Sequence, residues 1–284
     1  MFTINKNLAE VGLPFAVYEQ GHSSHDLILI INAFGVRREF WNYFAGHFSR
    51  THKCVIWDLH MPQESGPGGA NMADVSLDKH LNDIDAILEL YVHHQNVHLI
   101  GWCTGAELAV QYWLHSRHKR IRSMALLNGA YRFPDQKKTT AFINNLFILV
   151  HQVVKNPAGV SLYLDFLNRN MASQAQMLNA SNAHIQELVN LALESEENLL
   201  RYSHLLNDFN AWPTAAYDDV NVPSLLITGD LDGLVADELT VCAAAKNPQF
   251  DLLHLSNQDH YLLYHNQQVW DAIHAHMRSH TAHC

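Results

Sequence analysis

The stretch that decides the fold is VHLIGWCTGA, residues 97–106. Its first residues belong to a predicted strand, residues 96–101. Residues 104–115 are predicted to form a helix, so the strand runs directly into it. Between the two lies the pentapeptide GWCTG, with Cys103 at its centre. A turn of the form glycine–x–nucleophile–x–glycine between a strand and a helix is typical of a nucleophile elbow.

The two glycines of this pentapeptide have a mechanical reason. A nucleophile at so tight a turn sits in a strained conformation, and side chains on Gly101 and Gly105 would collide with neighbouring backbone. The turn also places the sulfur of Cys103 at the N-terminus of a helix, where the helix dipole favours a negative charge. The sequence therefore predicts that Cys103 is a nucleophile.

Outward from this turn, strands and helices alternate along the chain. Strands are predicted at residues 26–31, 53–57, 96–101, 122–127, 223–228 and 250–255. Helices follow most of these strands. Repeated β-α-β units indicate a mostly parallel sheet that is covered by helices on both faces. The predicted fold class is α/β.

The alternation stops between about residues 131 and 212. Only helical stretches are predicted there, at 139–154, 161–167, 185–193 and 197–210. A helical insertion between two strands of a parallel sheet predicts a cap over the carboxyl edge, where α/β proteins bind ligands. We therefore expect three segments: a first part of the core (1–130), a helical cap (131–213) and a second part of the core (214–284).

The substrate pocket is expected under this cap. Its predicted substrate-binding residues are Trp102, Phe142, Phe147 and Phe166. The alternative for the cap residues is that they only pack the cap on the core.

Two loops downstream supply the other groups of a catalytic triad, first an acid and then a histidine. One is GDLDGLV, residues 229–235, and the other is SNQDH, residues 256–260. We assign Asp232 as the acid and His260 as the base, with Asp230 as the rival for the acid. The alternative is that these are ordinary loop residues.

These motifs together resemble the α/β-hydrolase superfamily over nearly the whole chain. Residues 32–35, NAFG, resemble the His-Gly-Phe-Gly oxyanion loop of that family. Residues 229–235 resemble its Gly-x-x-Asp-x-x-Val acid loop, which favours Asp232 over Asp230. The resemblance implies the α/β-hydrolase fold with an inserted helical cap.

The resemblance also implies an oxyanion hole made by the backbone N–H groups of Phe34 and Thr104. Two features depart from the family pattern. Asn32-Ala33 replaces His-Gly, which changes what orients the oxyanion loop. Cysteine replaces serine, and a Gly-x-Cys-x-Gly box is similar to those of dienelactone hydrolases and polyhydroxyalkanoate synthases.

Sulfur chemistry narrows the predicted substrate. A thiolate is a better leaving group than an alkoxide, so attack on a plain ester tends to reverse, whereas thioester exchange is nearly balanced. We expect an acyl-transfer enzyme that forms an acyl-thioenzyme from a small-molecule thioester or activated ester, as a thioesterase or an acyltransferase. Thioesters of coenzyme A or of an acyl carrier protein are the candidate donors. The alternatives are a lactone or ester hydrolase of dienelactone-hydrolase type and a non-catalytic ligand-binding protein on the same fold.

Composition excludes several other classes. The chain has 284 residues, of which 48% are hydrophobic and 16% charged, as expected of a globular protein with a large core. A net charge of −10 argues against a nucleic-acid partner. No signal peptide or membrane span is predicted, and the four scattered cysteines favour the cytoplasm. We expect no cofactor. His276 and His280 lie one helical turn apart, but exposed histidines are favoured over a metal site.

Overall fold

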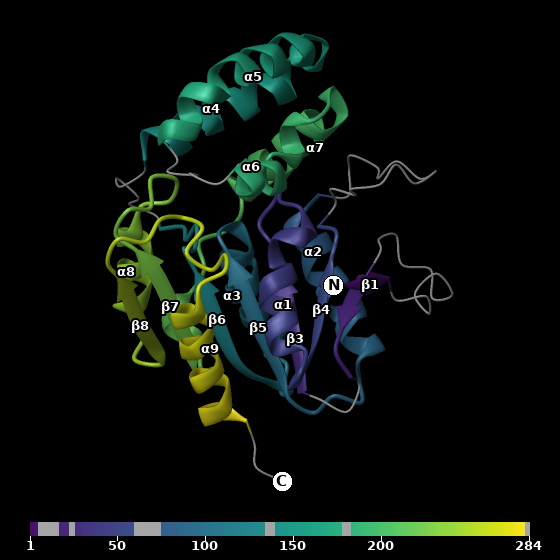
Figure 1. The fold of residues 1–284 in the computed structure, drawn as a ribbon, viewed down its shortest axis with the longest axis vertical. Helices are drawn as coiled ribbons and strands as arrows, with labels where there is room; N and C mark the ends of the chain where they lie inside the picture. The colour runs from purple at the N-terminus through teal and green to yellow at the C-terminus, as the bar shows by residue number, and fades with distance from the viewer. Residues whose placement is uncertain (5–16, 23–25, 60–74, 134–139, 178–182, 282–284) are drawn as a thin grey trace.

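The centre of the molecule is an eight-stranded sheet with the order β1-β2-β4-β3-β5-β6-β7-β8 (Figure 1). The computed structural model describes residues 1–4, 17–22, 26–59, 75–133, 140–177 and 183–281. The strands are β1 (Thr3–Ile4), β2 (Val17–Gln20), β3 (Asp26–Ile31), β4 (His52–Trp57), β5 (Val97–Trp102), β6 (Ile121–Leu127), β7 (Ser224–Gly229) and β8 (Phe250–Leu255). Strands β3 to β8 pair in parallel, whereas β1 and β2 pair antiparallel at one edge. The predicted mostly parallel sheet is confirmed.

Alternate residues of the central strands enter two different cores. In β3, Leu27, Leu29 and Ile31 belong to one hydrophobic cluster, while Ile28 and Ile30 belong to another on the opposite face. All five side chains are fully buried. Because successive side chains of a strand point to opposite faces, a continuous apolar run is what a sheet covered on both sides requires.

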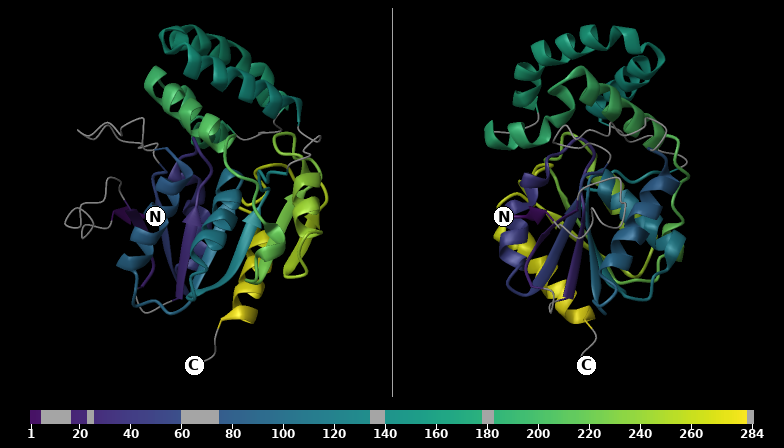
Figure 2. Two further views of the ribbon diagram at one scale, coloured as in Figure 1. Left: turned by 180° about the vertical axis from the view of Figure 1, so that it is seen from behind. Right: turned by 90° about the vertical axis from the view of Figure 1, so that its right-hand side faces the viewer.

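Helices cover both faces of the sheet (Figure 2). Apolar residues of α1 (Asn42–Phe48) and α9 (Gln267–His280) fill the core on one face. Apolar residues of α2 (Leu77–Leu90), α3 (Thr104–Ser116) and α8 (Asp237–Ala244) fill the core on the other. This three-layer arrangement leaves the ends of the strands as the place where a site can form.

Four helices between β6 and β7 lie together beyond one end of the sheet (Figure 1). They are α4 (Ala141–Lys155), α5 (Val160–Met177), α6 (Ala183–Val189) and α7 (Glu196–Phe209). We call them the cap. Two of them begin at hydroxyl N-caps, Thr140 for α4 and Ser195 for α7, whose side chains accept backbone N–H bonds. Within the described ranges, no helix is both long and apolar enough to cross a membrane.

The histidines near the C-terminus differ from expectation. His276 is buried on α9, in the same apolar face as Ile273 and Met277, and its Nε2 lies 3.4 Å from the carbonyl oxygen of Pro223. Burial lowers its pKa. The expectation of exposed histidines is therefore wrong for His276, because its position along the helix turns it toward the core. The described residues contain no cluster of three or more possible metal ligands.

Candidate active site

Cys103 sits at the tip of a strained turn between β5 and α3. Its backbone has φ 54° and ψ −119°, a conformation that is rare for a residue with a side chain. The turn demands glycine on both sides. A Cβ on Gly101 would lie 2.6 Å from the carbonyl oxygen of Gly105, and a Cβ on Gly105 would overlap the carbonyl of Ile31. The backbone therefore packs too closely at Gly101 and Gly105 for either position to hold a side chain.

Backbone hydrogen bonds hold Cys103 in this conformation. Its N–H donates to the carbonyl of Leu127 at the end of β6, at 3.0 Å. Its carbonyl accepts from the N–H groups of Ala106 and Ala130, both at 3.1 Å. The thiol is in no disulfide and is partly exposed to the cavity above it. Three hydrogen bonds thus fix the backbone of Cys103, while its sulfur stays accessible.

A histidine and an aspartate from two other loops complete the arrangement. Nδ1 of His260 lies 2.7 Å from Oδ2 of Asp232, and both side chains are almost fully buried. The other carboxylate oxygen, Oδ1, accepts the backbone N–H groups of Leu234 and Val235, each at 2.9 Å. These bonds orient the carboxylate so that one oxygen faces the imidazole.

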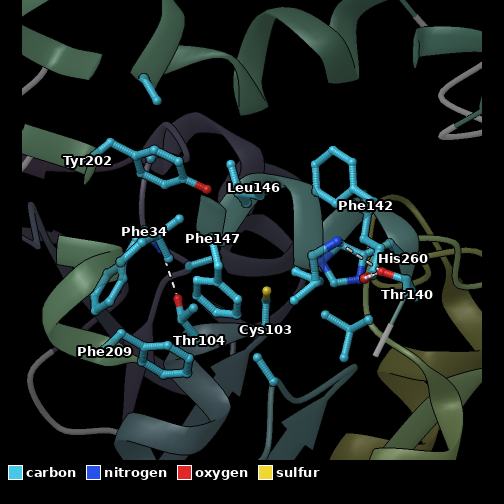
Figure 3. Close-up of a pocket in the computed structure, with 18 of the residues that line it drawn as sticks. Phe34, Cys103, Thr104, Thr140, Phe142, Leu146, Phe147, Tyr202, Phe209 and His260 are labelled. Carbon is cyan, nitrogen blue, oxygen red and sulfur yellow. Dashed lines mark hydrogen bonds between the residues drawn. The ribbon is translucent and has the colours of Figure 1, made fainter. Parts of the chain in front are cut away.

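The charge of the imidazole follows from its neighbours. Burial alone would lower the pKa of His260, but the charges of Asp232 and Cys103 and the hydrogen bonds to both raise it to about 10. In Figure 3, the sulfur of Cys103 points into the cavity beside the ring of His260. With Nδ1 directed at Asp232, Nε2 is the nitrogen left to exchange a proton with sulfur. The surroundings therefore favour the imidazolium that forms when the histidine takes a proton.

The structure distinguishes between the two candidate acids. Oδ1 of Asp230 accepts the backbone N–H of Asn257 at 2.6 Å, in an exposed loop. Asp232 is the carboxylate that the fold brings to the imidazole. The three residues predicted to act together, Cys103, Asp232 and His260, thus meet at one end of the sheet.

Two side chains that the sequence did not assign to this role hold the backbone of His260. The carbonyl of His260 accepts the indole N–H of Trp102 at 3.0 Å and the amide of Asn128 at 2.9 Å. Trp102 was predicted to bind substrate. It borders the cavity, but its ring is buried and stacked on Phe40, with centroids 4.5 Å apart. Its donor is engaged by the histidine loop, so its main contacts are structural. The position of Asn128, a polar residue directly after the buried strand β6, could have indicated a role at this end of the sheet.

The loop predicted to form the oxyanion hole is held by Asn32. Its amide donates to the carbonyl of Val36 at 2.7 Å, and its Oδ1 accepts from the N–H of Ala33 and the indole of Trp41. Asn32 thereby orients the loop where the family pattern has histidine. The N–H of Phe34, however, does not point freely into the cavity, because it donates to Oγ1 of Thr104 at 3.0 Å.

A largely apolar cavity of about 450 Å³ lies between the ends of the strands and the cap. Its lining includes Cys103 and His260 together with the predicted residues Phe142 and Phe147 (Figure 3). Phe166 does not line it. This side chain is 57% exposed on α5, on the same outward helix face as Leu162, so the structure places it outside the cavity that holds Cys103 and His260.

Tyr202 is a cavity residue that sequence reasoning missed. It comes from α7, and Figure 3 shows its hydroxyl directed into the cavity above Cys103. Its ring packs against Gly35, where a Cβ would lie 2.9 Å from the ring carbons. Burial raises the pKa of the phenol. Nothing in the sequence pattern of an amphipathic helix distinguishes this tyrosine from a packing residue.

A buried carboxyl group lies one helical turn after the nucleophile position. Glu107 accepts the hydroxyl of Tyr217 at 2.7 Å and the amide of Gln111 at 2.9 Å. Burial raises its pKa to about 7. These bonds make Glu107 part of the packing beneath the elbow. This role was not predicted from the sequence.

Comparisons with known proteins identify the fold. A family model described as alpha/beta hydrolase fold matches residues 26–267. Among solved structures, a bromoperoxidase from Bacillus anthracis is 17% identical with a TM-score of 0.71, over 98% of this chain and 100% of that one. An esterase from Exiguobacterium antarcticum is 13% identical with a TM-score of 0.71, over 93% and 96% of the two chains. An esterase from a Rhodococcus species is 14% identical with a TM-score of 0.73, over 94% and 96%. No curated protein matches the chain in sequence.

Proposed function

Because the chain belongs to the alpha/beta hydrolase fold family, we propose that it is an acyl-transfer enzyme that forms an acyl-thioenzyme on Cys103. Family membership supports an esterase-type enzyme. One observation carries the finer proposal. A partly exposed sulfur on a strained elbow lies beside His260, whose other ring nitrogen is held by a buried carboxylate at 2.7 Å.

The acylation step follows from these contacts. Nε2 of His260 takes the proton from the thiol of Cys103, and the thiolate forms a bond to the acyl carbon while the carbonyl electrons move onto oxygen. The tetrahedral intermediate then expels the leaving group, which receives the proton from Nε2. Asp232 keeps its hydrogen bond to Nδ1 and stabilises the imidazolium throughout. The raised pKa of His260 favours this proton transfer.

Release of the acyl group repeats the same steps with a second nucleophile. Water or another acceptor loses its proton to His260 and attacks the thioester carbon, and Cys103 leaves as a thiolate that takes the proton back from Nε2. With water the enzyme is a thioesterase, and with an amine or alcohol it is an acyltransferase.

The chemistry of sulfur and the character of the cavity point to the substrate. Exchange of one thioester for another is nearly balanced, so a thioester donor can load Cys103 without a large energetic cost. The cavity of about 450 Å³ is lined mainly by apolar side chains, which suits an acyl group. We therefore propose a thioester or activated ester as the donor, with coenzyme A or acyl carrier protein thioesters as the candidates.

Hydrolysis of an ester or lactone is the second candidate. Two of the similar structures are esterases, and the same constellation of groups can cleave such bonds. The two candidates differ in the leaving group, since an ester must expel an alkoxide from an intermediate that can also expel the thiolate.

Intact-protein mass spectrometry separates these possibilities. The protein is incubated with a panel of acyl-coenzyme A thioesters and oxygen esters of the same acyl groups. We expect an acyl adduct from the thioesters, lost in Cys103→Ala and kept in Cys242→Ala, which removes an exposed free cysteine as a matched control. Faster reaction with the oxygen esters would favour the second candidate. No adduct and no turnover with any donor would favour a non-catalytic binding protein.

A further inference from the structure

The hydrogen bond between Phe34 and Thr104 changes how an oxyanion hole can form here. The N–H of Phe34 donates to Oγ1 of Thr104 at 3.0 Å, and the two residues are only 4% and 6% exposed. Both line the same cavity as Cys103, and Figure 3 shows the hydrogen bond between them. One of the two backbone donors expected at this position is therefore already used by a side chain.

The same contact leaves a different donor available. Thr104 accepts the Phe34 bond through Oγ1, and no acceptor among the described residues receives its hydroxyl hydrogen. A hydroxyl group can accept and donate at the same time, and it rotates to suit a partner. A buried donor without a partner costs free energy, so an acceptor supplied by substrate would be favoured. Thr104 is also the first residue of α3, where the backbone N–H has no acceptor within the helix.

We propose that the Thr104 hydroxyl is a catalytic oxyanion donor, with the Phe34 N–H orienting it. This inference rests on the proposed function of Cys103. The N–H bond to Oγ1 fixes the hydroxyl oxygen and polarises its O–H bond, which then donates to the oxygen of the tetrahedral intermediate. The backbone N–H of Thr104 is the second donor. No proton is transferred in this interaction, because the hydrogen bond only strengthens as negative charge develops on oxygen.

The competing explanation is that the hydroxyl merely fills the place where the N–H of Phe34 would otherwise bind the oxyanion. The two explanations make opposite predictions for Thr104→Val, which keeps the shape of the side chain and removes the hydroxyl. If the hydroxyl is the donor, the variant loses one donor. If the hydroxyl only blocks the site, the variant frees the N–H of Phe34 and gains one.

The experiment compares Thr104→Val with Thr104→Ser, which keeps the hydroxyl. We expect acylation of Cys103 by a thioester to slow by about 100-fold in the valine variant, with KM changed by less than about threefold, as for loss of one oxyanion donor. The serine variant should stay within about fivefold of wild type. Acylation in Thr104→Val that is as fast as wild type, or faster, would overturn the proposal.

Alkylation by iodoacetamide provides a readout that separates chemistry from packing. This reagent reacts with sulfur by direct displacement, so no tetrahedral oxyanion forms. Alkylation of Cys103 should therefore proceed equally in wild type and Thr104→Val, whereas a general disturbance of the elbow would slow alkylation and acylation together and contradict the proposal.

Two further outcomes are distinguishable. If the valine variant does not fold, as judged by its thermal melt, Thr104→Ala and Thr104→Ser are compared in the same way. If wild type itself forms no acyl adduct, the proposed function fails first. If wild type forms the adduct and the valine variant matches it, only the role of the Thr104 hydroxyl fails.

Discussion

Replacing Asp232 with asparagine would remove the charge that faces His260 while keeping the size of the side chain. The carboxylate oxygen lies 2.7 Å from Nδ1, and the two side chains are 0% and 4% exposed, so solvent screens the pair little. With charge centres about 4 Å apart and an effective dielectric constant of about 20, the attraction is about 4 kcal/mol. Since about 1.4 kcal/mol corresponds to tenfold, acylation of Cys103 should slow by about a thousandfold.

The pH dependence of the variant has a definite sign. In wild type, the folded-state pKa of His260 is about 10, against an ordinary value of 6.5. The stabilisation that this provides is fully present below pH 6.5 and is lost as the pH rises through about 10. Asp232→Asn should therefore lower the melting temperature more at pH 6 than at pH 10. The loss of activity should persist across about pH 7 to 9, because the variant lacks the carboxylate that stabilises the imidazolium formed when His260 takes the proton of Cys103.

Thermal melts at pH 6 and pH 10 test the first statement, and single-turnover acylation, measured by mass spectrometry at pH 6, 8 and 10, tests the second. Asp230→Asn is the matched control, because that carboxylate lies on the same loop, accepts the backbone N–H of Asn257 and is exposed. We expect this control to acylate within about threefold of wild type. If Asp232→Asn acylated as fast as wild type, or if Asp230→Asn were the slower of the two, the assigned role of the Asp232 carboxylate would be refuted.

Glu107→Gln should change stability in a pH-dependent way. Burial raises the pKa of Glu107 from 4.5 to about 7, so the free energy of unfolding of wild type falls as the pH rises through this range. Glutamine does not titrate, so the variant should become more stable relative to wild type by about 3 kcal/mol between pH 4.5 and pH 8. Equal pH slopes in denaturant unfolding would contradict this. Gly105→Ala puts a methyl group against the Ile31 carbonyl and should greatly lower the melting temperature. Gly46→Ala, in open space on α1, should stabilise the protein by about 0.5–1 kcal/mol. Equal melting temperatures for the Gly105→Ala and Gly46→Ala variants would contradict this reasoning.

The periodicity of the sequence was sufficient to predict the parallel core. Continuous apolar runs such as 26–31 require cover on both faces, which is a local property of the strand. The edge strands β1 and β2 were missed, because β1 is a two-residue exposed strand and β2 ends in Glu19 and Gln20, so neither has an apolar pattern.

The residues that meet at the site were largely predictable from their positions in the chain. Strand ends in a parallel sheet lie at one edge, so Cys103, Asp232 and His260, each after a strand, were expected to come together. The glycines of the elbow were predictable for a similar reason, since a tight turn is a local constraint.

What each side chain touches was decided only by the tertiary structure. The direction of Asp232 toward His260 depends on how two loops close, and Trp102 contacts the histidine loop from 158 residues away in sequence. The outward position of Phe166 depends on how α5 is rotated against the other helices of the cap, which the apolar character of the residue does not specify. The bond from the Phe34 N–H to the Thr104 hydroxyl joins residues 70 positions apart. Local patterns determine which elements form and where they end, whereas contacts between side chains of different loops exist only once packing has placed those loops.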